Sequence, residues 1–308
     1  MKRMIILGSI LVVLVGAWLV QRRQQQSLIV SEPVDTWSVD PDRVTSLRID
    51  KPDGEFVELV RSAGSWKLAA PLQYSANEQV VTASLRVLEA LELADVISTN
   101  PANQDKYQVD STGTRVVVKA GDEVLLSVVV GTNSPDFSHT YVRRTDANEV
   151  YRAVGVLSYN FNKRVDDWRD KTILSFDQQN ISQVTLEYPK KKSSVVVVRM
   201  DSTWTVQDVG GAAQTADSLG VANLLRTASS LNTVNFATDD ETAGLDFEKP
   251  DFRLTVETDA GTTVVTFVEG ESNKYYAMLA GNAAVFQLFK SSLTNVMKTS
   301  ADLRPKES

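Results

Sequence analysis

Along most of the chain, apolar and polar residues alternate in short stretches. Turn residues lie between these stretches. Alternation with a period of two is typical of strands that bury one face. In the first half it predicts strands at 44–50, 56–61, 66–68, 115–119, 124–130, 141–143 and 150–151. In the second half it predicts strands at 181–188, 193–199, 204–206, 251–257, 264–268, 276–278 and 285–286. Because short turns connect many of these strands, we expect antiparallel sheets.

Several segments of the first half return in the second half in the same order. GSWKL at 64–68 returns as STWTV at 202–206, and RVVV at 115–118 returns as RLTV at 253–256. DWRDK at 167–171 returns as DLRPK at 302–306. The offsets of 138, 138 and 135 residues indicate that one folding unit was duplicated.

Helical spacing of apolar residues follows the first strand group in each half. Ser75 and Glu78 match a capping box, in which a hydroxyl and a carboxylate satisfy free amide groups at the start of a helix. The predicted apolar stripes are Val81, Leu85 and Leu88 in the first copy and Val221, Leu224, Leu225 and Ala228 in the second. A second helix is predicted to close each copy, with the stripes Val154, Leu157, Phe161, Val165 and Trp168, and Phe289, Leu293, Val296 and Met297.

Residues 4–20 contain no charged side chain. A helix of this length would extend about 25 Å, slightly less than the roughly 30 Å hydrocarbon core of a bilayer. Arg22 and Arg23 can extend to the interface and make up part of the difference. The alternative is a cleaved secretory signal, but no small-residue cleavage site follows. We therefore predict an uncleaved transmembrane helix formed by Met4–Val20.

The two flanks of this helix carry two basic side chains each, so the positive-inside signal is nearly balanced. The free amino group adds positive charge to the N-terminal flank and favours that end inside. We therefore predict a single-pass protein of the inner (cytoplasmic) membrane. The bulk of the chain is expected on the periplasmic, or extracytoplasmic, side.

The chain beyond the predicted anchor is acidic. The whole chain has a formal charge of −7, and its first 23 residues carry four basic and no acidic side chains, so the remainder has a charge of −11. Such a body repels phosphate backbones, and we expect no nucleic-acid partner.

Together these patterns predict an α+β protein. We expect two tandem homologous domains, each with antiparallel β-sheets and two helices, behind one N-terminal transmembrane helix. The predicted parts are an anchor at 1–23, a linker at 24–41, a first repeat at 42–171 and a second repeat at 172–308.

Residues that commonly carry chemistry are few. His139 is the single histidine, and one histidine without cysteine cannot form the usual zinc ligand set. The chain has no G-x-S-x-G, S-x-x-K or P-loop sequence. We therefore predict no catalytic, cofactor-binding or metal-binding residues and no cofactor, and we place His139 at a surface or strand edge.

Clusters of like charge have a functional and a structural interpretation. The carboxylates at 166–167 and 239–241 could bind calcium or act as acid and base, but adjacent carboxylates on loops are usually solvated. The lysines at 190–192 are expected at a hairpin tip, and contact with lipid headgroups is the alternative.

Two tryptophans and two arginines recur with their surroundings. Trp66 and Trp204 return inside equivalent strands, which favours core positions over carbohydrate stacking. Arg169 with Asp167, and Arg304 with Asp302, are expected to cap a helix end or to pair at the repeat junction.

The tandem unit with GSWKL at 64–68, LRPK at 303–306 and the anchor before it resembles the domain-of-unknown-function family 4340. The similarity covers most of residues 42–308. The resemblance implies a bacterial envelope protein, often encoded beside the permease and ATPase of an ABC-type transport system related to gliding-motility auxiliary components. It supplies no catalytic residues. The chain departs from the first copy at Pro305, which stands where that copy has Asp170.

Two hypotheses about function follow. The first is a membrane-anchored, extracytoplasmic, non-enzymatic binding or scaffold protein, an accessory component of an ABC-type transport or envelope system. The second is an anchored hydrolase that uses carboxylates to act on envelope polymers. Because no histidine- or serine-centred constellation is present, we favour the first. Solute capture between the repeats is a third possibility.

Overall fold

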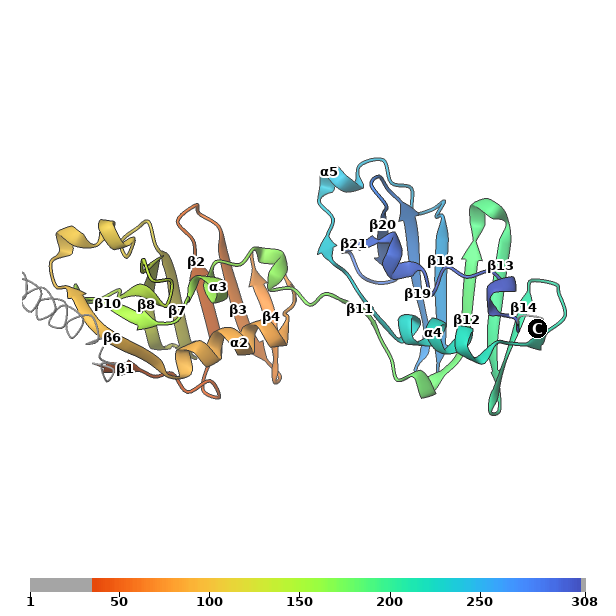
Figure 1. Cartoon of the computed structure of the whole chain (residues 1–308), viewed down its shortest axis with the longest axis horizontal. Coiled ribbons are helices and arrows are strands. Elements are labelled where there is room, and N and C mark those ends of the chain that lie inside the picture. The colour runs from red at the N-terminus through yellow and green to blue at the C-terminus, as the bar shows by residue number, and fades with distance from the viewer. Residues whose placement is uncertain (1–34, 306–308) are drawn as a thin grey trace, which may run out of the picture. The chain divides into compact units, whose positions relative to one another are not determined.

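The computed structural model describes residues 35–305, which form two compact units divided between Arg169 and Asp170 (Figure 1). Both units consist mainly of antiparallel strands with few helices. The predicted anchor at 1–23 and the first part of the predicted linker lie outside the described residues. Between residues 35 and 305, no helix is long and apolar enough to cross a membrane.

The first unit contains one ten-stranded antiparallel sheet in the order β1-β6-β10-β9-β8-β7-β2-β3-β4-β5. Its strands are β1 (Asp35–Trp37), β2 (Ser46–Asp50), β3 (Phe56–Ser62), β4 (Ser65–Ala70), β5 (Tyr74–Ser75), β6 (Leu91–Ser98), β7 (Thr114–Ala120), β8 (Glu123–Asn133), β9 (His139–Arg144) and β10 (Val150–Val154). Every strand predicted in this half of the chain is confirmed.

The alternation along each strand separates an inner face from an outer face. On β2, Leu47 and Ile49 are fully buried, whereas Arg48 between them is partly exposed. Successive side chains of a strand point to opposite faces, so the inner face forms the core and the outer face carries polar groups.

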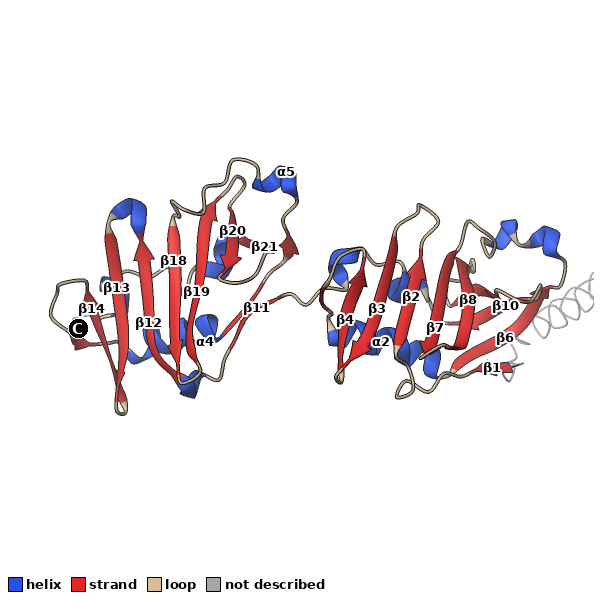
Figure 2. Cartoon of the chain, turned by 180° about the vertical axis from the view of Figure 1, so that it is seen from behind, coloured by secondary structure: helices blue, strands red, loops and turns tan. Residues whose placement is uncertain are grey.

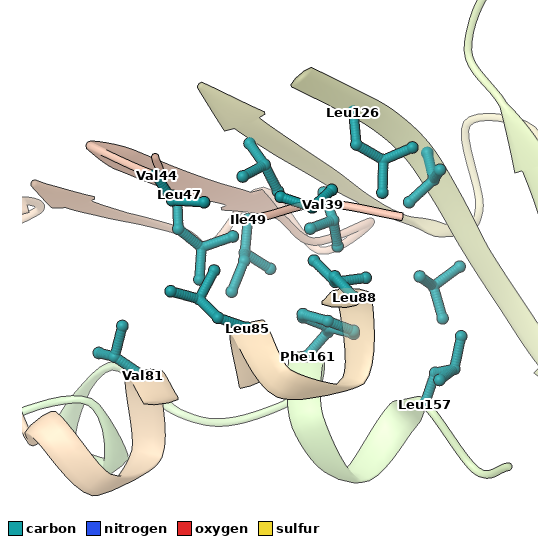
Figure 3. Close-up of a cluster of buried hydrophobic side chains, with 14 of the residues drawn as sticks. Val39, Val44, Leu47, Ile49, Val81, Leu85, Leu88, Leu126, Leu157 and Phe161 are labelled. Atoms are coloured by element: carbon teal, nitrogen blue, oxygen red, sulfur yellow. The ribbon is translucent and has the colours of Figure 1, made fainter. Parts of the chain in front are cut away.

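The inner face is covered by helix α2 (Glu78–Glu89). Val81, Leu85 and Leu88 are buried on one side of this helix, as the predicted stripe requires. Figure 3 shows these side chains directed toward Leu47 and Ile49 of β2. This packing removes apolar surface from water on both elements and is the main source of their stability.

The predicted capping box at the start of α2 is wrong. Ser75 is the last residue of β5 and pairs with Lys67, so it cannot serve as the N-cap. The N-cap is Asn77, whose side chain accepts a hydrogen bond from the amide of Val80. The Glu78 carboxylate accepts a hydrogen bond from the amide of Trp66 at 2.6 Å. The glutamate therefore ties the helix to β4.

The predicted closing helices are also wrong. Val154 is the last residue of β10, and Gly155 then turns the chain with a φ of 96°. Two short turns follow, α3 (Ser158–Phe161) and the 3₁₀ helix η3 (Val165–Asp167). In the second unit the 3₁₀ helix η6 (Lys290–Leu293) follows a strand directly. The buried residues of these segments lie on separate turns, and their spacing only imitates one helical stripe.

Three strands of the first sheet, β1, β5 and β6, are not predicted by the alternation. β1 lies inside the predicted linker at 24–41, so the folded body begins by residue 35. Its Trp37 is 4% exposed and packs edge-on against Tyr151, with ring centroids 5.4 Å apart. β1 pairs with β6. No turn sequence separates β6 from the end of α2, so the sequence pattern does not mark where this strand begins.

The second unit contains a nine-stranded antiparallel sheet in the order β15-β14-β13-β12-β18-β19-β20-β21-β17 (Figure 2). Its strands are β12 (Ile181–Tyr188), β13 (Ser193–Met200), β14 (Thr203–Asp208), β15 (Gln214–Thr215), β17 (Asn235–Phe236), β18 (Phe252–Thr258), β19 (Gly261–Glu269), β20 (Lys274–Leu279) and β21 (Val285–Phe289). The strands predicted in this half are confirmed. β11 (Thr172–Ser175) and β16 (Ser230–Asn232), which were not predicted, form a separate antiparallel pair.

Helix α4 (Ser218–Ser229) follows β15, as α2 follows β5. Its predicted stripe is buried, and its N-cap Asp217 accepts a hydrogen bond from the amide of Gly220. The remaining short helices are η1 (Pro101–Asn103), η2 (Asp105–Tyr107), η4 (Gln178–Asn180), η5 (Pro189–Lys191), α5 (Asp239–Thr242) and η7 (Ala301–Leu303).

The two sheets share their strand order. From β5 to β10 the first sheet runs β5-β4-β3-β2-β7-β8-β9-β10, and the second runs β15-β14-β13-β12-β18-β19-β20-β21. In both sheets the first four strands of this series are followed in the chain by a helix. Equivalent positions in the two units can therefore be compared through the strand register.

Candidate functional site

His139 lies at the start of β9, where the sequence placed it, and its side chain is 22% exposed. Its Nδ1 lies 2.8 Å from Ser138 Oγ and 3.3 Å from Asp136 Oδ2. Asp136 also accepts a short hydrogen bond from the hydroxyl of Ser134 and another from the amide of Ser138. The hydrogen bond from Ser134 holds the pKa of the Asp136 carboxyl well below its usual range.

This group differs from a catalytic triad. In a triad the serine and the carboxylate contact opposite nitrogens of the imidazole, which lets the ring pass a proton between substrate groups. Here Ser138 and Asp136 both contact Nδ1 of His139. All of the residues come from the single turn at 134–139 between β8 and β9. The network therefore stabilises that turn.

The acidic clusters are used in local structure. Asp166 pairs with Arg169 at 2.9 Å, and Asp167 accepts a hydrogen bond from the amide of Arg164. At 239–241, Glu241 closes a capping box with Thr238 at the start of α5. Among residues 35–305, no three His, Cys, Asp or Glu side chains are grouped so that they could hold a metal ion.

The lysines at 190–192 lie at the predicted hairpin tip, between β12 and β13. Lys190 forms an ion pair with Asp251 at 2.6 Å, and Lys191 lies 5.6 Å from the ring centroid of Tyr188. Two of the three ammonium groups thus have partners within their own unit.

The recurring tryptophans occupy different environments. Trp66 is 5% exposed and belongs to the core, as predicted. Trp204 is only half-buried, and the guanidinium of Arg199 lies 4.9 Å from its ring centroid. The core prediction therefore holds fully only for the first copy. Near the end of the second unit, Arg304 pairs with Asp208 at 3.0 Å, a partner that the sequence did not suggest.

A cationic pocket of about 580 Å³ lies on the outer face of the first sheet. In Figure 2 the strands of this sheet lie in front of α2, so the outer face is toward the viewer. We call this the outer-face pocket. It is lined by Arg48, Asp50, Arg115, Val117, Lys119, Val124, Leu125, Leu126, Ser127, Arg144, Thr145 and Asp146. Four of these side chains are basic and two are acidic, so the pocket is cationic within an acidic body.

One cation of the pocket is fixed by its neighbours. Arg48 pairs with Asp50 at 2.7 Å and with Glu58 at 3.4 Å, and its guanidinium lies 4.6 Å from the ring centroid of Phe56. The hydrogen bond to Asp50 raises the pKa of Arg48 above its ordinary value. Arg48 is therefore a permanently charged group in a defined position.

The rim and floor complete the geometry. Thr145 donates a hydrogen bond to Ser127 Oγ at 2.9 Å, which ties the loop after β9 to β8. Val117 is nearly buried in the floor, whereas Val124 is 52% exposed. The pocket thus offers apolar contact area beside cations, which suits recognition of a ligand that is both anionic and partly apolar.

Sequence reasoning did not identify the outer-face pocket. Arg48, Arg115 and Lys119 were recognised only as the polar positions of predicted strands. The available signal was that basic side chains recur at outward positions of two strands that turned out to be adjacent, β2 and β7. Adjacency could not be read from the sequence, because β2 and β7 are separated in the chain by four other strands and α2.

The fold and the pocket define a protein of two antiparallel sheet units with a cationic pocket on the first. The family described as "Domain of unknown function (DUF4340)" matches residues 66–247, from β4 of the first unit to the segment after α5 in the second. The chain belongs to this family. No curated protein and no solved structure matches it.

Proposed function

We propose that this protein is a membrane-anchored, extracytoplasmic binding protein without enzymatic activity, and that it serves an ABC-type transport or other envelope system as an accessory component. The apolar segment at 4–20 is the proposed anchor. Membership of DUF4340 supports the proposal through the envelope location and transporter company that the resemblance implies.

We further propose that the two units are homologous products of one duplication. The shared order of eight strands supports this, as do the sequence segments that return at offsets of 138, 138 and 135 residues. Duplication yields two similar sheets whose outer faces can diverge, because those faces contribute less to the core than the inner faces do. Such divergence is a simple route to a binding surface on one unit only.

The outer-face pocket is the observation that carries the binding role. It combines four cations of the sheet with an apolar floor, and it lies on the outer face, away from the core. The groups most often used in catalysis, by contrast, are engaged in the turn at 134–139 and in helix capping. A surface that offers charge and contact area without a reactive constellation is suited to holding a partner.

Site-directed cross-linking tests this function. The chain contains no cysteine, so Val124→Cys places one thiol in the pocket of the full-length protein. A benzophenone maleimide on that thiol is illuminated in native membranes. We expect one or more adducts of defined mass that include a transporter or envelope subunit. Lys67→Cys, on the outer surface of β4 but outside the pocket, is the matched control and should give those adducts several-fold more weakly.

Two outcomes would contradict the proposal. Equal adducts from both positions would mean that the pocket has no special role in contact. Absence of adducts from Val124→Cys, in membranes where the chain is present at its normal level, would refute the proposed binding function.

A further inference from the structure

We propose that the outer-face pocket binds an extended, acidic segment of a partner protein, with Arg115 and Lys119 as the cations that meet its carboxylates. This inference rests on the proposed binding function and adds the chemistry of the partner. It is carried by the strand register together with the contacts of these two cations, which have no side-chain partner among residues 35–305.

Arg115 is left without a partner because its natural acceptor is occupied. In the register of β2 and β7, Arg115 lies opposite Asp50. Arg48, on the same strand as Asp50, holds that carboxylate at 2.7 Å. Arg115 forms no hydrogen bond or ion pair through its side chain with any of residues 35–305. At the equivalent register position of the second unit, Arg253 lies opposite Glu187 and pairs with it at 3.2 Å.

The comparison shows that the arrangement in the first unit is specific to it. Thr185 of β12 occupies the register position equivalent to Arg48, so no second arginine competes for the carboxylate there. The second unit therefore has the same strand order as the first, but its cross-strand ion pair is formed. In the first unit, Arg48 takes the carboxylate and a guanidinium is released toward solvent.

Lys119 gives a second, independent contrast. It lies opposite Ser46 in the register, and its ammonium group has no partner among the described residues. The equivalent residue of the second unit is Glu257, which lies opposite Gln183 and accepts a hydrogen bond from its amide at 2.7 Å. The fold thus accommodates a carboxylate at this position. The charge at Lys119 is reversed between the units, and of the three positions compared, the first unit has a cation at all three and the second only at Arg253.

The charge of Arg48 is met by Asp50 and Glu58 within the sheet. Arg115 and Lys119, which lie on the same face of β7, have no carboxylate partner among the described residues. Two such cations on one face attract an anionic ligand.

The apolar floor narrows the choice of ligand. Val117, Val124 and Leu125 lie beside the cations and offer contact to apolar side chains. An extended peptide presents every second side chain to the same side, so acidic and apolar side chains at those positions can contact the cations and the floor together. A bare phosphate would leave the floor uncovered. A flat anionic membrane would also meet the acidic body, whose charge beyond the first 23 residues is −11.

The test uses the full-length protein in neutral detergent. The probe is a short synthetic peptide in which glutamate and leucine occupy every second position and serine fills the positions between them. It carries an uncharged fluorophore, and binding is followed by fluorescence anisotropy. We expect saturable binding that weakens several-fold when NaCl is raised from about 50 to about 300 mM. The same peptide with glutamine in place of glutamate should bind at least about tenfold more weakly.

Charge reversal within the pocket is compared with charge reversal outside it. Arg115→Glu with Lys119→Glu should weaken peptide binding at least about tenfold. The control is Lys67→Glu with Arg86→Glu, which changes the net charge equally on two exposed side chains of the same unit that lie outside the pocket. It should change binding by no more than about twofold. Arg115→Gln with Lys119→Gln, which keeps side-chain volume, should give an intermediate loss, and circular dichroism checks that each variant is folded.

Several results would overturn the inference. One is an equal effect of the two double charge reversals, and another is binding of the glutamine peptide as tight as that of the glutamate peptide. A third is saturable binding of inorganic phosphate, or of vesicles with phosphatidylglycerol, that competes with the labelled peptide more strongly than unlabelled peptide does. If the glutamate peptide did not bind but Val124→Cys still gave the cross-links, the inference of an acidic partner segment would be refuted and the proposed function would stand. Absence of those cross-links would refute the proposed function itself.

Discussion

Asp50 has two arginine neighbours, and it pairs with Arg48, which leaves the guanidinium of Arg115 available on the outer face of the first unit. Arg48 approaches along the same strand and contacts one carboxylate oxygen through both Nε and a terminal nitrogen, at 2.9 and 2.7 Å. Arg115 approaches across the register. An ion pair at a partly exposed site contributes little stability, about 1 kcal/mol or less. The ion pair between Arg48 and Asp50 therefore adds little stability itself. Its main consequence is that the guanidinium of Arg115 has no acceptor within the sheet.

Asp136 supports a prediction about acid pH. Its carboxyl pKa is held below the ordinary value by hydrogen bonds from Ser134 and Ser138 that favour the ionised form. A depressed pKa contributes stability above the pKa of the unfolded chain, near 4, and this contribution is lost as pH falls toward the folded pKa. We expect Asp136→Asn to reduce the dependence of unfolding free energy on pH below about 4, and to increase hydrogen exchange in the turn at 134–139 at neutral pH.

The measurement is urea unfolding between about pH 3 and 7, with amide hydrogen exchange at neutral pH. Asp122→Asn is the matched control, because Asp122 lies on a hairpin turn of the same sheet and makes no side-chain hydrogen bond within residues 35–305. If both variants altered exchange at 134–139 equally, the carboxylate network would not be what holds the turn.

At the scale of elements, the start of α2 tests which residue caps the helix. Asn77 accepts a hydrogen bond from the amide of Val80, whereas Ser75 pairs in β5. Asn77→Ala should lower the free energy of unfolding by about 1 kcal/mol, because it leaves a helical amide without its acceptor. Ser75→Ala should change it by less than about 0.5 kcal/mol. Chemical denaturation of both variants provides the comparison.

Asn77→Asp adds a positive control, since aspartate also accepts hydrogen bonds at the N-cap and favours the positive end of the helix dipole. It should retain most of the stability that alanine loses. A larger loss from Ser75→Ala than from Asn77→Ala would instead favour the capping box that the sequence suggested.

The elements that could be predicted are those whose pattern is local. β2, with Leu47 and Ile49 on one face, can be predicted from the alternation of its residues and from the turn that follows it. β6 does not, because it begins one residue after α2 and its pairing with β1 is set by tertiary structure. The segment at 154–168 was misassigned because the buried residues Leu157, Phe161 and Trp168 have spacing close to that of a helix. Tertiary burial of separate turns imitated a local periodicity.

At the scale of the whole molecule, the recurrence of sequence segments predicted two similar parts, but the outer-face pocket could not be predicted in the same way. The recurring segments contain the residues that both units share, and these are mainly core positions such as Val118 and Val256. The outer-face pocket depends on what the units do not share, such as Lys119 against Glu257. A difference of this kind acquires meaning only when the register shows which strands are neighbours.

The two units also predict how the chain can be divided. The core cluster of the first unit draws its buried residues from Trp37 to Trp168, and the second unit buries its own aromatic residues, among them Phe252 and Phe267. Because each unit closes a sheet on its own helix, fragments 35–169 and 170–308 should each fold without the other. Each should show the far-ultraviolet circular dichroism of β structure and a cooperative thermal transition.

The matched control is a cut inside the first sheet. A fragment ending at residue 133 would lose β9 and β10 and leave one side of β8 unpaired, so we expect it to lack a cooperative transition and to aggregate. Fragment 35–169 also contains the entire outer-face pocket, so it should bind the acidic peptide as tightly as the full chain does, within about twofold. A folded fragment 35–169 that failed to bind would show that the peptide requires the second unit or residues before 35. An unfolded fragment would show that the division after Arg169 is not a boundary of stability.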